Sequence, residues 1–230
     1  MKRTPASPAS RSKARASRAA PATPGVHYRV ELADLHAHVY GVTLTIDPPA
    51  ALQTVSMPVW IAGSYMVREF SKQVVSISAH QQGQPVVVQQ LDKCTWQMHC
   101  APDAPLTLQY RVHAHDNSVR TAWLDAQRGF FNATSLCLAV AGREDQAHAL
   151  DLVPHPDVPQ WQVATGLTAV KVNAQGFGRY CASDYDELAD CPVEMGDFWS
   201  GSFTACGVPH RFVVAGAPPS FDGERLLRDA

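Results

Sequence analysis

Apolar and polar residues alternate along much of this chain, and this period of two is the feature that most restricts its fold. The clearest run covers residues 106–115, where every even position is apolar and every odd position is polar. Residues 42–46 and 94–99 repeat the pattern, and the first of these stops at Asp47-Pro48-Pro49. Side chains of a strand point alternately to its two faces, so such runs predict strands with one buried face.

Turn signals punctuate these runs, as expected where short strands follow one another. The further runs typical of strands are 86–88, 136–140, 161–164 and 211–214, and the turn signals are 82–85, 101–103, 142–145 and 154–159. Helical signals are confined to 184–188 and 222–229, the latter with acid first and arginine later. We therefore predict an all-β fold, an antiparallel β-sandwich or saddle-like sheet, in which a helix begins only near residue 222.

Composition divides the chain into three parts. Residues 1–25 are rich in Ala, Ser and Pro and carry six basic residues and no acid, so we expect a disordered tail. Residues 26–196 form the β-rich domain, and residues 197–230 are expected to be a connection and the start of an α-helical catalytic domain. The tail lacks the apolar region of a secretory signal and no segment has the length of a membrane span, which predicts a cytoplasmic protein without membrane contact.

Charge disfavours a nucleic-acid partner for the body of the protein. Beyond residue 25 only 13 basic residues remain against 21 acidic ones. An acidic surface repels phosphate backbones, so binding of nucleic acid by the body is not expected. The basic tail leaves weak contact with nucleic acid as a minor alternative.

No catalytic motif or strong metal motif occurs in the sequence. No histidine is followed by glutamate, so the zinc motif His-Glu-x-x-His is excluded, and Gly-x-Ser-x-Gly and a phosphate-binding loop are also missing. His36-x-His38 and His113-x-His115 have a spacing that a metal could use, but a solvent-facing sheet surface is the favoured interpretation. The six cysteines form no C-x-x-C pair and are expected to be reduced. We predict no catalytic residue, metal ligand or cofactor in this chain.

Residues 58–70 combine an apolar entry, a turn and charged residues. Trp60, Gly63 and Tyr65 lead to Arg68 and Glu69, so the segment predicts a strand that turns at Gly63-Ser64 and is fixed by an Arg68–Glu69 ion pair. The favoured role is structural, because a half-exposed ion pair contributes little to stability.

Two other clusters of polar residues are candidates for a role. Arg120 closes Asp116-Asn117-Ser118-Val119, typical of an Asx-type turn and also interpreted as structural. Residues 184–196 contain five carboxylates, which serve as helix caps and turn residues in the favoured interpretation. In the alternative, Glu194 faces a cleft and binds a cationic group such as the α-amine of a peptide.

These segments occur in the order seen in the N-terminal domain of the glycyl aminopeptidase family of zinc metallopeptidases, which the chain resembles over roughly residues 26–230. The segments that carry the resemblance are 28–32, 58–70, 92–96, 110–112, 116–120, 129–132, 184–188, 192–196 and 207–210. In that family a β-rich domain precedes a thermolysin-like domain with His-Glu-x-x-His, one zinc ion and a glutamate base. None of those residues has a counterpart here, so the resemblance implies zinc only for a full-length member.

The resemblance predicts the N-terminal, non-catalytic portion of a zinc metalloaminopeptidase. Its partners would be its own catalytic domain, against which it packs, and the peptide substrate, whose cleft it helps to form. Whether this protein is an enzyme stays open, since the parent family is enzymatic and this chain lacks the motif. The alternative is a free-standing β-sandwich module that binds a peptide or protein through a sheet edge, with apolar surface near Trp199 and Phe203 as the partner site.

We expect the purified chain to show no aminopeptidase activity with zinc added, because no residue in it can hold the metal or act as the base. Release of amino acids from small peptide substrates would be measured with and without zinc. Turnover that copurifies with the chain through successive columns would contradict the interpretation.

Overall fold

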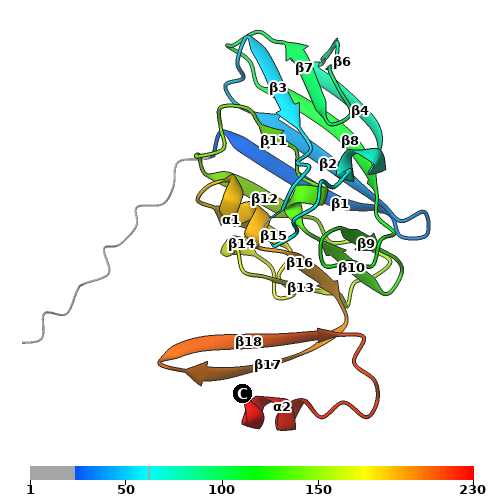
Figure 1. Ribbon diagram of the computed structural model, residues 1–230, viewed down its shortest axis with the longest axis vertical. Helices are drawn as coiled ribbons and strands as arrows, with labels where there is room; N and C mark the ends of the chain where they lie inside the picture. The colour runs from blue at the N-terminus through cyan, green and yellow to red at the C-terminus, as the bar shows by residue number, and fades with distance from the viewer. Residues whose placement is uncertain (1–23, 62) are drawn as a thin grey trace, which may run out of the picture.

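The computed structural model describes residues 24–61 and 63–230, and β-strands make up most of the regular structure in that part of the chain (Figure 1). The largest sheet of the described residues has eight strands. In spatial order these are β14 (Thr168–Val172), β15 (Gly178–Ala182), β12 (His148–Leu152), β1 (Val26–Asp34), β2 (Val39–Ile46), β8 (Leu106–His113), β4 (Val74–Gln81) and β5 (Gln84–Val86). The predicted alternation at 106–115 is confirmed, since the even positions of β8 are buried.

Two smaller sheets complete the body. One contains β11 (Ala139–Val140), β3 (Leu52–Ser56), β7 (Thr95–His99) and β6 (Gln89–Gln90). The other contains β13 (Gln162–Thr165), β16 (Val193–Gly196), β10 (Arg128–Phe131) and β9 (Ala122–Leu124). A continuous cluster of buried residues includes side chains from all three sheets. The predicted β-rich fold with mainly antiparallel sheets is therefore confirmed.

One pairing departs from the antiparallel rule. Strand β1 runs parallel to β12, with Val26 opposite His148, although it is antiparallel to β2 on its other side. Asp151 of β12 ties the region together, because it accepts hydrogen bonds from Arg179 of β15 at 2.7 and 2.8 Å and contacts His27 of β1 at 2.8 Å. Arg179 lowers the pKa of Asp151. Sequence alternation is the same for both strand directions, so it could not predict this pairing.

The buried segment 136–138 corrects the expectation of a strand at 136–140. Only Ala139 and Val140 are paired, while the residues before them follow the 3₁₀ turn η2 (Ala133–Ser135) in irregular buried backbone. The carbonyl groups of residues 136–138 accept hydrogen bonds from three buried tyrosine hydroxyls and not from a neighbouring strand. The bonds are Tyr110 Oη to Leu136 O at 2.9 Å, Tyr185 Oη to Cys137 O at 2.7 Å and Tyr28 Oη to Leu138 O at 2.7 Å.

The short helices occur near the predicted positions. Helix α1 (Tyr185–Asp190) is capped by Asp184, whose Oδ1 accepts from the Glu187 N–H at 2.7 Å. Helix α2 (Gly223–Asp229) is capped by Asp222 in the same way. A short 3₁₀ turn, η1 (Phe70–Gln73), precedes β4. No helix in the described ranges has the length and apolar character needed to cross a membrane.

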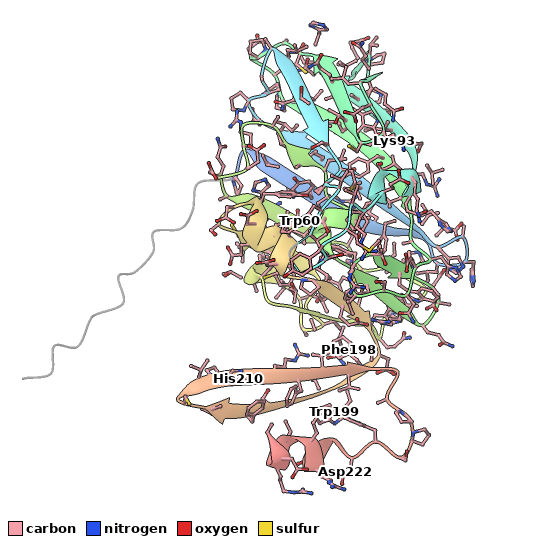
Figure 2. The ribbon with its side chains drawn as sticks, viewed as in Figure 1. Trp60, Lys93, Phe198, Trp199, His210 and Asp222 are labelled. Carbon is pink, nitrogen blue, oxygen red and sulfur yellow. The ribbon has the colours of Figure 1, made fainter. Side chains whose placement is uncertain are left out.

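The last part of the chain lies apart from the three sheets (Figure 1). Strands β17 (Phe198–Ala205) and β18 (Val208–Ala215) form a two-stranded hairpin, and α2 returns to pack on β17. Figure 2 shows Trp199 between the hairpin and the helix that Asp222 caps. A Cβ atom at Gly223 would lie 2.2 Å from the Trp199 ring, so only glycine permits this contact. The division at residue 197 stays a proposal, and the predicted disorder of residues 1–25 concerns mainly residues 1–23, which lie outside the described ranges.

We expect Tyr110→Phe to lower the free energy of unfolding by about 1–3 kcal/mol, because it removes the donor to a buried carbonyl. The same hydroxyl accepts the Leu138 N–H at 3.2 Å, so a second buried group also loses its partner. Urea unfolding would measure the change. Tyr65→Phe is the control, since Tyr65 is 91% exposed and should stay within roughly 0.5 kcal/mol of the wild type. Equal effects of both substitutions would contradict the role of the hydroxyl.

Candidate functional site

The segment 59–68 forms a loop whose base is closed by its own backbone. The Arg68 N–H donates to Val59 O at 2.7 Å, and the Ser64 N–H donates to Ile61 O at 3.2 Å. Gly63 lies between them with φ of +74°, a conformation that favours glycine. The predicted turn at Gly63-Ser64 is therefore confirmed. The strand expected to lead into the turn is wrong, because Ile61 forms only an isolated bridge with Ser64 across the turn.

Arg68 braces this loop from within. Its Nε and Nη2 atoms donate to Ser64 Oγ at 3.0 and 2.7 Å, and Ser64 is buried at 4% exposure. The predicted ion pair between Arg68 and Glu69 is wrong, because the chain turns into η1 at Phe70 and the two side chains take different partners. The sequence could not reveal this partner, since nothing marks a serine four residues earlier as the acceptor.

Glu69 instead pairs with a distant residue. Lys93 Nζ donates to Glu69 Oε1 at 2.9 Å across the surface. This hydrogen bond lowers the pKa of Glu69 and raises the pKa of Lys93. Both groups are exposed, so the pair contributes little to stability and serves mainly to compensate the charge of Glu69.

The outer surface of the loop is apolar and open to solvent. Tyr65 is 91% exposed, Val67 75%, Met66 64% and Trp60 54%. Figure 2 shows Trp60 beside α1, and its ring lines a cavity of about 450 Å³ together with Tyr185 and Asp186 of that helix. We call Trp60, Tyr65, Met66 and Val67 the loop patch. Large apolar side chains that are exposed together are a common feature of surfaces that contact a partner.

Glu194 lies on β16 and is fully engaged with arginine. Its Oε1 and Oε2 atoms accept from Arg128 Nε and Nη2 of β10 at 2.7 and 2.9 Å. The hydrogen bonds that Arg128 donates to Glu194 raise the pKa of Arg128, whose Nη1 donates to Asn117 Oδ1 at 3.1 Å. The pair borders a cavity of about 440 Å³ that Trp123 and Trp161 also line. A bidentate arginine compensates the carboxylate, so the binding of a peptide amine by Glu194 stays a prediction and would require displacing Arg128.

Arg120 lies in an exposed turn, as predicted. The Ser118 N–H donates to Asp116 O at 2.8 Å and the Arg120 N–H donates to Ser118 Oγ at 3.3 Å. The hydroxyl of Thr121 donates to Asp116 O at 2.8 Å. The predicted Asx-type turn is wrong, because Asp116 accepts these bonds through its backbone carbonyl and not through its side chain. The Arg120 side chain forms no ion pair with the described residues.

A cluster of histidines was not predicted, because its members come from separate segments. The rings of His38 and His115 stack at 3.9 Å, and His115 stacks on Trp123 at 4.4 Å, while His113 lies 6.2 Å from His38. His36 remains outside it, exposed in the turn after β1. Stacked rings do not direct their nitrogens to one point, and no group of three or more potential ligands in the described part of the chain could hold a metal. The described residues therefore do not fit the zinc ion that the resemblance implies for a full-length member of the family.

Comparison with known proteins places this β-rich fold in a family. The model of the Peptidase M61 N-terminal domain matches residues 27–197, so the chain belongs to this family. Its fold is similar to that of an aminopeptidase N family protein from Idiomarina loihiensis, with 39% identity and a TM-score of 0.85, over 89% of this chain. The chain spans only 34% of the length of that protein. The predicted family and its β-rich N-terminal domain are thereby confirmed.

More distant structures are also similar to the chain. An M1 zinc metallopeptidase from Deinococcus radiodurans is 12% identical with a TM-score of 0.47, covering 86% of this chain and 49% of its own. Aminopeptidase A from Legionella pneumophila is 11% identical with a TM-score of 0.49. The match covers 84% of this chain and 24% of that protein. No curated protein sequence matches the chain.

We expect Glu194→Gln to lower the free energy of unfolding by roughly 1.5–3 kcal/mol, because the half-buried Arg128 loses its charged partner. The matched control is Glu31→Gln in the exposed Arg29–Glu31 pair, which should cost at most about 1 kcal/mol. Urea unfolding of both variants gives the comparison. If Glu194→Gln proves as mild as its control, the carboxylate is not held mainly by Arg128 and a ligand role gains support.

Proposed function

We propose that this chain is the non-catalytic N-terminal portion of a zinc metalloaminopeptidase, which packs against the catalytic domain and helps to form the peptide cleft. The observation that carries the proposal is the loop patch. Four large apolar side chains on a closed loop would cost free energy in water if nothing covered them. Membership of the peptidase family supports the nature of the partner.

The way the loop is built supports docking without rearrangement. Backbone hydrogen bonds close its base and Arg68 braces it through Ser64, so little conformational entropy is lost on binding. Glu69, two residues after Val67 in the chain, is exposed and pairs with Lys93, as in the polar rim of an interface. The catalytic zinc, its ligands and the general base would come from the other domain.

The alternative, a free-standing module that adds a strand from a partner, has weaker support. Edge strand β14 is exposed along its whole length, as strand addition requires. However, its pairing with β15 is irregular between Ala169 and Lys171, and a lysine lies on the edge. Both features protect an edge against pairing with other strands. The apolar side of the hairpin near Trp199 is partly covered by α2, which reduces it as a partner site.

Mixing the chain with the remaining two-thirds of the Idiomarina loihiensis protein tests the proposal. We expect a one-to-one complex in analytical ultracentrifugation. Combined Tyr65→Ser, Met66→Ser and Val67→Ser substitutions should weaken it by at least tenfold, because they remove most of the apolar contact area. Val87→Ser serves as the control, since Val87 is 84% exposed but lies outside the patch.

Two results would contradict this proposal. One is a complex that the triple variant forms as tightly as the wild type. The other is the absence of any complex when both fragments are folded by circular dichroism. In either case the loop patch has another partner, and the module interpretation gains support.

A further inference from the structure

A small cavity of about 100 Å³ lies beside the base of the loop, between η1 and the segment that follows β8. A cavity of this size has room for water molecules or a small polar group. Its polar lining includes the charged residues Arg68, Glu69, Lys72 and Asp116, together with His113 and Ser135. The cavity is separate from the Glu194–Arg128 pair and from the outer surface of the loop patch.

Arg68 brings unused hydrogen-bond donors to this cavity. A guanidinium carries five N–H groups, and two of them are directed to Ser64 Oγ. No carboxylate in the described ranges forms an ion pair with Arg68, although its side chain is half-buried. Arginine is seldom fully buried unless it is paired, because leaving charged donors without acceptors costs free energy. The three remaining N–H groups therefore favour an acidic acceptor from outside.

The charges around the cavity favour an anion. Lys72 is exposed at its edge and forms no ion pair with any described residue. Glu69 is already compensated by Lys93 at 2.9 Å. Arg68 and Lys72 of the lining, together with Lys93, thus face the two carboxylates of Glu69 and Asp116, so positive groups exceed negative ones by one at the cavity.

We propose that this cavity binds a carboxylate group of a peptide. The carboxylate oxygens would accept from the Nη1 and Nη2 atoms of Arg68 on the side that Ser64 leaves open, and Lys72 would supply a second positive charge. The planar guanidinium of arginine can bind both oxygens of a carboxylate at once, which the ammonium group of lysine cannot do with the same geometry. Ser64 fixes the guanidinium before the ligand arrives, which lowers the entropy lost on binding. The site is a property of this chain by itself, so it goes beyond the proposed docking to a catalytic domain.

Two peptide groups share this chemistry, namely the C-terminal carboxylate and the side chain of Asp or Glu. The probes are N-acetyl-glycylglycine, its C-terminal amide, and N-acetyl-aspartate amide, each titrated into the ¹⁵N-labelled full chain at constant ionic strength. We expect saturable shifts of the amide signals of Ser64, Glu69 and Ala122 with a carboxylate probe, at least tenfold weaker with the amide. The probe that binds more tightly identifies the source of the carboxylate.

Variants then assign the binding to the cavity. Arg68→Gln should weaken the tighter carboxylate probe by at least about tenfold, since it removes charge-assisted hydrogen bonds. Lys72→Gln should weaken it by about two- to fivefold, and this exposed position tests the site even if Arg68→Gln disturbs the loop. Arg211→Gln is the matched control, because Arg211 also donates to a serine hydroxyl, Ser200 Oγ at 3.3 Å, but on the distant hairpin.

Three outcomes would overturn the inference. They are equal binding of the acid and its amide, binding unchanged by both Arg68→Gln and Lys72→Gln, and signal shifts confined to residues away from the cavity. Loss of binding in the Arg211→Gln control would also overturn it, since the effect would then follow net charge alone. None of these results depends on the complex tested above, so the two proposals can fail separately.

Discussion

The hydrogen bonds from three tyrosine hydroxyls to the carbonyls of residues 136–138 are the constraint on which the rest of the structure depends. This backbone is buried and has no neighbouring strand as a partner, and buried carbonyls without donors would be costly. Tyr110, Tyr185 and Tyr28 come from β8, α1 and β1, so the bonds join the large sheet, the helix and the crossing segment. Burial raises the pKa of each tyrosine well above its ordinary value, which keeps the donors protonated.

The consequences extend to the surface. Segment 136–138 is fixed between two short elements. After it, β11 pairs with β3, and before it, η2 lies next to the two cavities that border the 59–68 loop. Ser135 therefore lines the small cavity, and Thr134 with Tyr185 lines the larger one next to Trp60. The loop patch and the proposed carboxylate site thus rest on one buried support, which allows an exposed apolar loop to keep a defined shape.

Arg68 and Arg128 differ in the groups that accept their hydrogen bonds. Arg128 is satisfied by Glu194 and Asn117 within the chain, so this pair acts chiefly as structure. Arg68 is held by a neutral hydroxyl and keeps donors in reserve. Both residues are arginines in polar surroundings, yet only the second is left to recognise something else. The two proposals above assign partner docking to the loop patch and carboxylate binding to Arg68.

The sequence by itself determined the β-rich class, the strand at 106–113, the helix caps at Asp184 and Asp222, the family and the absence of the zinc motif. These are local patterns or linear motifs, which short stretches carry in full. Tertiary structure alone decided the parallel pairing of β1 with β12, the tyrosine bonds to 136–138, the stacked histidines and the partner of Glu69. Each of these interactions joins residues far apart in the chain. The bond from Arg68 to Ser64 could not be predicted either, although the two residues are only four apart, because it depends on the turn at Gly63.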